Sequence, residues 1–394
     1  ASYLNSDYYR KYLTRYDTVN QFVNKEELLV IGEKIVQKDL ANTLSRISKY
    51  GYKEFYNGKT AKYIVETMKN HGGLIDHNDL QSYSPIERAP IHFKYRDYNI
   101  YSMPEPSSGG IVLAEILNQL ENYNFNSINF FHSYKHIFLT AEAEKQAYSD
   151  RAKYLGDPSF HSENIDFLTT QAYADSLWLN INYDKPIDIK DIYNFNINEK
   201  EETTHYSIVD KFGNAVSVTT TLNGWFGSGI IVNDAGFLLN NEMDDFSAKP
   251  GFPNKYGLIG SEANSIAPKK RMLSSMSPTI VTDIEDDLYL VLGSPGGSTI
   301  ITTIAQIIQN VIDFEMNIQE AVTKPRFHHQ FVPNNIYYEK HSISSDVIKK
   351  LEDIGYSTEL RRSIGEANCI QFNKSTNTYY GTSDRRRNGK SLGY

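Results

Sequence analysis

Cysteine is nearly absent from this sequence of 394 residues, since Cys369 is the only one. A single thiol excludes an intramolecular disulfide framework and any metal site built from several thiolates. Without disulfides the sequence leaves the cellular compartment open. Cys369 stands in a segment with strand character, where a lone cysteine is most often a small core residue.

The sequence also lacks an excess of positive charge and a long apolar run. Its 40 Lys and Arg residues against 48 Asp and Glu give a net charge of −8, so it shows no basic footprint for nucleic acid. No stretch approaches the roughly 20 apolar residues of a transmembrane helix. The polar first residues do not have the order of a secretory signal, which predicts either a cytosolic protein or a mature or truncated chain.

Aromatic and aliphatic residues, by contrast, are plentiful. The chain has 29 Tyr, 19 Phe and 2 Trp, with 40% hydrophobic and 22% charged residues. These values are typical of a globular protein that buries a substantial core. The length allows two domains or one large two-layer unit of helices and strands.

The first two hundred residues are predicted to be mainly helical. Helices are expected at 111–120 and 133–154, and an alternating pattern predicts a strand pair over 91–103. Residues 182–202 are polar, charged and without periodicity, which predicts an exposed linker.

After residue 202 the pattern changes to strands. We expect strands at 207–209, 215–218, 237–239 and 289–292. The last of these leads into a glycine-rich loop and then an amphipathic helix that starts near Ile300.

The first two of these strands form a predicted hairpin. With a three-residue turn at 211–213, Ile208 faces Val216 and Thr203 faces Thr221. Directly opposed residues have Cβ atoms about 4.5–5.5 Å apart, so the two threonine hydroxyls can meet. Such a pair is common in any sheet, and alone it does not indicate catalysis.

Five ordered motifs together resemble the γ-glutamyltransferase (γ-glutamyltranspeptidase) family. They are TTHYS at 203–207, TLN at 221–223, NNEMDDF at 240–246, LSSMSP at 273–278 and GSPGG at 293–297. The first part of the chain is similar to the large subunit of that family, through GGLI at 72–75, YSMPEPSSGG at 101–110, AEAEK at 141–145 and YLGDP at 154–158.

The resemblance implies an N-terminal-nucleophile hydrolase of the α+β class, folded as an αββα sandwich. It also implies self-cleavage between Glu202 and Thr203, which divides the chain into a mainly helical large-subunit region, 1–202, and a small-subunit region, 203–394. A threonine hydroxyl is a poor nucleophile at pH 7 and needs a base. The cleavage would supply one, since an α-amino group titrates near 7.7–8.0.

The resemblance assigns the catalytic roles to four residues. Thr203 is the nucleophile, Thr221 orients it, and Gly296 and Gly297 form the oxyanion hole. The glycine segment is alternatively a simple strand-to-helix turn or a phosphate cradle, although no lysine follows it as in a P-loop. His205 could serve as a histidine base by its direction along the strand, but this enzyme class needs none.

The resemblance also assigns a pocket for a free amino-acid head group. Asn223, Glu242 and Asp245 match positions that bind the ammonium group, and Ser274 and Ser275 match positions that hold the α-carboxylate.

Each of these motifs also has a plainer interpretation. The acidic pair at 244–245 could be a solvated turn or a metal-ligand pair, although no neighbouring residue has ligand spacing. The serine pair could be a capped turn before Pro278. We expect His328 and His329 to serve packing and hydrogen bonding, and the arginines at 385–387 to form a solvated basic patch.

The segment 250–260 matches a lid over the family's pocket, with Tyr256 at its tip. A lid favours small γ-glutamyl substrates such as glutathione. Family large subunits extend well upstream of Ala1, and that stretch carries a signal peptide and an arginine for the substrate α-carboxylate. On this basis we expect an N-terminally incomplete, feebly active or inactive chain from a periplasmic or secreted protein.

The function implied is γ-glutamyl transfer from glutathione and similar donors, through a γ-glutamyl-threonine intermediate, to water or to amino acid or dipeptide acceptors. No cofactor, metal or nucleic-acid partner is expected. Two alternatives remain open, namely a poly-γ-glutamate hydrolase on the same scaffold and a catalytically silent fragment that acts as a binding module.

Overall fold

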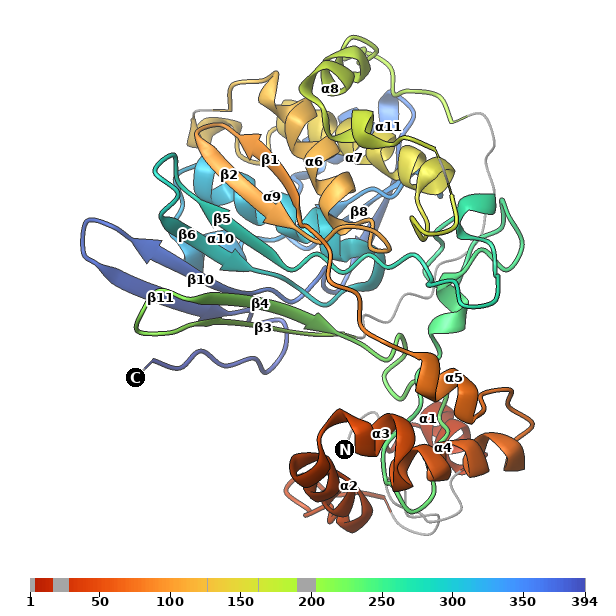
Figure 1. Cartoon of the computed structure of the whole chain (residues 1–394). Coiled ribbons are helices and arrows are strands. Elements are labelled where there is room, and N and C mark those ends of the chain that lie inside the picture. The colour runs from red at the N-terminus through yellow and green to blue at the C-terminus, as the bar shows by residue number, and fades with distance from the viewer. Residues whose placement is uncertain (1–3, 17–27, 126, 162, 190–202, 394) are drawn as a thin grey trace. The chain divides into compact units, whose positions relative to one another are not determined.

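The computed structural model describes residues 4–16, 28–125, 127–161, 163–189 and 203–393 (Figure 1). The chain forms two compact units, the first made of Ala1–Arg88 and Leu222–Asn241, the second of Ala89–Thr221 and Glu242–Tyr394. In the described ranges, no helix combines the length and the apolar character needed to cross a bilayer.

The first unit is helical. Its helices are α1 (Asp7–Thr14), α2 (Lys38–Tyr50), α3 (Tyr52–Asn57), α4 (Lys59–Asn70) and α5 (His77–Ser82). Ile64 of α4 packs with Val232 and Ala235 in a small core. The Thr43 hydroxyl of α2 donates to the Ala235 carbonyl at 2.9 Å, which fixes the segment 222–241 to the helices.

The strand expected at 237–239 is wrong. The Val232 amide donates to the Phe237 carbonyl at 2.9 Å, so the chain turns tightly here, and a single bridge joins Ile231 to Leu238. Phe237 stacks on Phe55 instead of entering a sheet. The apolar run at 237–239 therefore packs against helices. Periodicity alone does not distinguish such a run from a short buried strand.

The second unit is built on a large sheet with the strand order β1-β2-β5-β6-β10-β11. Its strands are β1 (Ile91–Tyr95), β2 (Tyr98–Ser102), β5 (Thr279–Thr282), β6 (Leu288–Leu292), β10 (Asn368–Asn373) and β11 (Thr378–Ser383). All neighbouring strands in it are antiparallel. The expected strand pair over 91–103 is thus confirmed, and Cys369 lies buried on β10.

Helices cover one face of this sheet (Figure 1). They are α6 (Gly109–Glu121), α7 (Tyr134–Tyr154), α8 (Gln171–Trp178), α9 (Ile300–Ile312), α10 (Ile318–Thr323) and α11 (Ser345–Asp353). Leu290 and Leu292 of β6 share the main core with Ile301 and Ile304 of α9. The helix predicted from Ile300 is confirmed, but it is buried around nearly its whole circumference, not along one stripe.

Smaller elements complete this unit. A sheet of β7 (Phe327–His328), β8 (Asn335–Glu339) and β9 (Ser357–Arg361) has a parallel pair between β8 and β9. Short 3-10 helices lie at Ile128–Phe130, Asp166–Thr169, Glu242–Asp245, Glu262–Asn264 and Gly297–Thr299.

The predicted hairpin consists of β3 (Thr204–Val209) and β4 (Ala215–Thr220), and its register is confirmed by the pair Ile208 and Val216. It packs on the sheet face opposite the helices (Figure 1). The Ser217 hydroxyl donates to the Leu292 carbonyl at 2.9 Å. The layers are therefore helices, sheet and hairpin, which confirms the α+β class.

The expected linker is exposed at 182–185, as predicted, but the prediction is wrong at 186–189, where the chain packs against α7. Ile189 is buried, and the Ile187 amide donates to the Glu142 carboxylate of α7 at 2.9 Å. The Lys145 ammonium donates to the Ile187 carbonyl at 3.0 Å. Glu142 and Lys145 form a buried ion pair on α7, which needs further hydrogen-bond partners. The backbone of Ile187 supplies them. Residues 190–202, including Glu202, lie outside the described residues.

The arginines at 385–387 do not form a solvated patch. Arg386 forms ion pairs with Asp384 and Glu339, and Arg387 pairs with Glu366 at 3.1 Å. Arg385 is exposed. Buried carboxylates need a cation nearby, and two of the three arginines fill that need.

Candidate active site

Thr203 immediately precedes β3, and Thr221 immediately follows β4 on the opposite strand of the hairpin. The Thr203 hydroxyl donates to the Thr221 hydroxyl over 3.3 Å. This distance is long for two hydroxyl groups, so the contact orients Thr203 more than it activates it. The structure therefore brings together the two threonines that the sequence pairs.

His205 is held away from the role of base. It is 4% exposed, its Nδ1 lies 2.9 Å from the Thr219 hydroxyl, and its Nε2 lies 3.1 Å from the Ser207 hydroxyl. Burial lowers its pKa to about 4, so the ring is neutral at pH 7. Both ring nitrogens contact hydroxyl groups of the hairpin, so His205 stabilises the hairpin and is not placed as a base for Thr203.

The glycine loop is pressed against this hairpin. A Cβ atom at Gly293 would lie 2.1 Å from the His205 ring, so a residue without a side chain is required at the end of β6. The Gly293 carbonyl accepts from the Asn368 amide at 3.0 Å, and the Asn368 side chain donates to the His205 carbonyl at 3.1 Å. The loop and the strand that follows Thr203 are thereby fixed to one another.

Gly296 and Gly297 lie where this loop enters the helical segment of α9. Gly296 has φ +145° and Gly297 has φ +54°. The Gly296 carbonyl accepts from the Thr299 amide at 2.9 Å and from its hydroxyl at 2.8 Å. Amide groups at the start of a helix favour negative charge, which suits an oxyanion hole and equally suits the plainer strand-to-helix turn.

On the oxyanion-hole assignment, Gly296→Ala is expected to lower kcat about a hundredfold to a thousandfold, the usual effect of losing one oxyanion donor, because the added methyl group would displace the amide groups of the loop. Its Cβ would meet the Thr299 hydroxyl at 2.6 Å and hold a strained φ. Steady-state kinetics measure the effect. Gly355→Ala is the control, because Gly355 has φ +112° with open space around it. Equal losses in the two variants would contradict the assignment.

Ser274 and Ser275 are held by hydrogen bonds to the loop at 104–108, which precedes α6. Ser107 and Ser274 form a parallel bridge, and the Ser108 hydroxyl donates to the Ser274 carbonyl at 2.9 Å. The Ser274 hydroxyl accepts from the Met276 amide at 3.1 Å. The plainer interpretation, a capped turn, is therefore correct locally, and it leaves the hydroxyl hydrogens available for a ligand.

Arg151 of α7 is a residue that the sequence analysis missed. It is 5% exposed and donates from Nη2 to the Ser275 hydroxyl at 3.2 Å. The signal that could have found it is helical spacing, since Ala143 and Ala147 precede it on a fully buried face. An arginine is rarely buried on such a face unless it has specific partners, so its presence there indicates a particular contact.

Glu242 and Asp245 lie on the 3-10 helix Glu242–Asp245, where their carboxyl groups hydrogen-bond to one another. Burial and the negative charges of Glu242 and Asp244 raise the pKa of Asp245 well above its usual range, while Arg151 opposes this rise. Burial also raises the pKa of Glu242. Two carboxyl groups in this arrangement share a proton, and an arriving ammonium group would allow both to ionise.

Binding of L-glutamate at a pH below the raised pKa of the pair is therefore expected to release up to about one proton. The pKa of the pair is raised without ligand and lowered by the ammonium group, so binding strengthens as pH rises through the raised pKa and then levels off. Calorimetry in two buffers of different ionisation enthalpy counts the protons. Binding without proton release would contradict the assignment of this pair.

Asn223 belongs to the first unit. It has φ +66°, and its side chain donates to the Asn241 carbonyl at 3.1 Å. Its part in binding an ammonium group stays a prediction.

The predicted lid at 250–260 is a loop closed at its base, where the Gly251 amide donates to the Gly260 carbonyl at 2.9 Å. Tyr256 is 4% exposed and packs in the main core, so its side chain points inward. Its carbonyl accepts from the Gln330 side chain at 3.0 Å. The covering role of the loop stays a prediction.

His328 and His329 serve packing and hydrogen bonding, as expected. His328 Nδ1 lies 2.9 Å from the Thr302 hydroxyl, and His329 Nε2 lies 3.0 Å from the Asn334 side chain. Both rings are buried.

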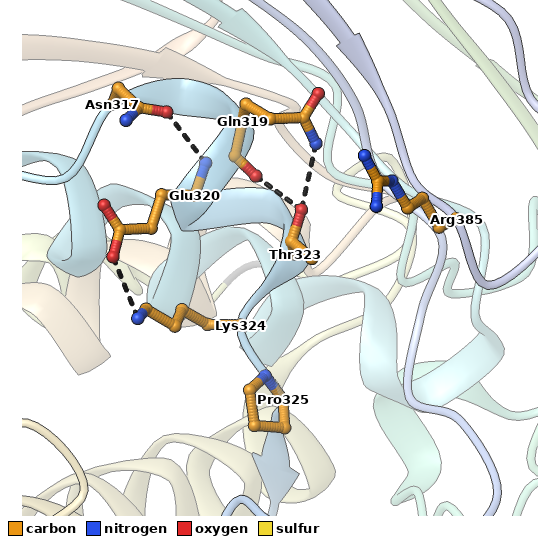
Figure 2. A pocket seen from close by; sticks show the side chains of 7 residues that line it. All are labelled: Asn317, Gln319, Glu320, Thr323, Lys324, Pro325 and Arg385. Atoms are coloured by element: carbon orange, nitrogen blue, oxygen red, sulfur yellow. Dashed lines mark hydrogen bonds and ion pairs between the residues drawn. The ribbon is translucent and has the colours of Figure 1, made fainter.

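A pocket of about 400 Å³ lies beside α10 and Arg385, and Figure 2 shows its polar groups. The Asn317 side chain accepts from the Glu320 amide at 2.9 Å, and Glu320 pairs with Lys324 at 2.9 Å. These groups satisfy one another, and none of the predicted site residues lines the pocket. It is separate from the threonine site.

Comparison with known proteins agrees with the motifs. The family model for gamma-glutamyltranspeptidase matches residues 1–394. A glutathione hydrolase proenzyme of Escherichia coli strain K12 is 47% identical over 93% of this chain, and one of Pseudomonas sp. strain A14 is 45% identical over 95%. The chain spans 63% and 66% of the lengths of these two relatives.

Among solved structures, cephalosporin acylase from Bacillus halodurans is similar with a TM-score of 0.82, at 24% identity, over 98% of this chain and 69% of the acylase chain. This likeness concerns the fold. Together with the layers described above, it confirms the expected α+β fold.

Proposed function

The chain belongs to the γ-glutamyltranspeptidase family, and we propose that it transfers γ-glutamyl groups through an acyl-enzyme on Thr203. The observation that carries this proposal is the position of Thr203 immediately before β3, with its hydroxyl donating to Thr221. The glycine loop that reaches α9 is fixed to the same strand through Gly293.

In this proposal the bond between Glu202 and Thr203 is cut first, which frees an α-amino group beside the Thr203 hydroxyl. The amine takes the hydroxyl proton as Oγ bonds to the γ-carbonyl carbon of the donor. Gly296 and Gly297 donate to the oxyanion. The C–N bond then breaks, and the leaving amine takes the proton. A water or an acceptor amine repeats these steps on the ester and returns the proton to Oγ.

The two regions, 1–202 and 203–394, would remain folded together after the cut. β2 of the first region pairs with β5 of the second, through Ile100 with Val281 and its neighbours. The α6 and α9 helices also contact one another across the same division. Cleavage would therefore free the amine without releasing either piece.

The proposed donors are small γ-glutamyl compounds, glutathione among them, and the names of the two bacterial relatives support this choice. The proposed acceptors are water, amino acids and dipeptides. Recognition of the donor head group is assigned to Asn223, Glu242 and Asp245 for the ammonium group, and to the serines 274–275 for the α-carboxylate. A periplasmic or secreted location belongs to the proposal and rests on the family resemblance.

The test is to incubate the chain with glutathione and, separately, with a γ-glutamyl anilide. We expect free glutamate from the first and the released aniline from the second, both at the low rate that the sequence analysis predicts for this chain. Poly-γ-glutamate serves as the competing substrate. Chain shortening without turnover of the small donors would favour the polymer hydrolase, and turnover of none of the three would favour a silent binding module.

A further inference from the structure

The geometry points to Arg151 as a positioning residue that directs the Ser275 hydroxyl toward the α-carboxylate of the donor. This inference rests on the proposed function, because it takes the serine pair as the carboxylate site. It adds a cation from α7, in the layer of helices, to a site otherwise made of loops.

Arg151 joins two loops that lie side by side. Its Nε donates to the Ser108 hydroxyl at 2.9 Å, and its Nη2 donates to the Ser275 hydroxyl at 3.2 Å. The Ser108 hydroxyl in turn donates to the Ser274 carbonyl at 2.9 Å. The Arg151 side chain thus holds both the loop at 104–108 and the loop that contains the serine pair in position.

The direction of these hydrogen bonds is fixed by chemistry. A guanidinium group is only a donor, so the Ser275 oxygen must accept from Arg151. The single hydrogen of that hydroxyl is then left for another acceptor, and a carboxylate oxygen is an acceptor only. A hydroxyl that accepts from a cation is also polarised and becomes a stronger donor.

The charges around Arg151 favour an anion at this place. Within the described residues its hydrogen-bond partners are the two serine hydroxyls, and no carboxylate lies within ion-pair distance of it. A buried cation with neutral partners is costly unless a negative group comes near. Asp245 and the Tyr148 phenol are the charged or titratable groups whose fields reach it.

Arg151 and Asp245 therefore give the proposed head-group site one positive and one negative side. The free amino-acid head of a γ-glutamyl donor carries an α-carboxylate and an α-ammonium group, which match these two sides. The inference predicts that Arg151 governs discrimination at the α-carboxylate and leaves the attack by Thr203 unchanged.

The experiment compares dissociation constants of L-glutamate and L-isoglutamine, in which an α-carboxamide replaces the α-carboxylate, by calorimetry on the self-cleaved chain. We expect the wild type to prefer L-glutamate at least tenfold, because a hydrogen bond to a charged group is worth more than one to a neutral group. Arg151→Met should remove most of this preference, and Arg151→Lys should restore part of it.

Arg96→Met is the matched control. Arg96 is partly buried, with 23% of its side chain exposed, and donates to Asp313 at 3.0 Å, but it contacts neither serine loop. It should lose stability and keep the wild-type preference. Thermal melting shows that each variant is folded.

The outcomes separate the inference from the function on which it rests. A folded Arg151→Met chain that keeps the wild-type preference would overturn the positioning role and leave the proposed function standing. A wild-type chain that binds both ligands equally, or neither, would overturn the carboxylate assignment and the inference with it.

Discussion

Thr203→Ala is expected to remain a single chain of 394 residues, whereas the parent chain is expected to yield two pieces, 1–202 and 203–394. The methyl side chain of alanine has no hydroxyl to attack the carbonyl of Glu202, and without the cut no α-amino base is formed at position 203. Turnover of γ-glutamyl donors should fall by more than about a thousandfold, as expected when a nucleophile is removed. Intact mass and initial rates measure the two effects.

Thr204→Ala is the matched control. Thr204 is the next residue, opposes Thr220 in the hairpin and is exposed. It should be cut and should retain most of its activity. A Thr203→Ala chain that is still cut at the same bond would refute the assignment of the nucleophile.

Asp245→Asn is expected to abolish most donor turnover while leaving self-cleavage intact. The substitution removes one charge from a buried acidic pair that we assign to an ammonium group. Removing one partner of a buried ion pair costs about 3–5 kcal/mol, or roughly a hundredfold to a few thousandfold in kcat/KM. Self-cleavage involves no substrate ammonium group, so the two pieces should still appear.

Asp244→Asn separates recognition from folding. The Asp244 carboxylate accepts from the Lys255 amide at 3.2 Å, so it makes a local structural contact. We expect a modest effect on donor turnover from this variant. Loss of both cleavage and turnover in Asp245→Asn would indicate misfolding and would contradict the ammonium assignment.

The parts of the fold that local chemistry determines could be predicted from the sequence. The hairpin register follows from its turn, and it places Thr203 opposite Thr221 as expected. The structure at 237–239 could not be predicted from local sequence, because Phe237 stacks on Phe55, which is far away in the sequence. A short apolar run is compatible with either environment.

The site residues that belong to sequence motifs could be predicted. The contacts that depend on how distant segments pack could not. Nothing local in the sequence brings Arg151 to Ser275, because the contact depends on how α7 packs beneath two loops. The neutral, buried state of His205 likewise depends on Gly293 at the end of a distant strand. The lid and the role of Asn223 remain predictions that rest on the family resemblance.

The most direct measurement of the central claim is the position of the γ-glutamyl group on the chain. The cleaved protein is mixed with a γ-glutamyl donor, quenched in acid within one turnover, and digested for peptide mass mapping. We expect one γ-glutamyl group as an ester on Thr203, at the N-terminus of the piece 203–394, and none in Thr203→Ala. A γ-glutamyl group found on another residue, or turnover with no acyl-enzyme at Thr203, would contradict the account.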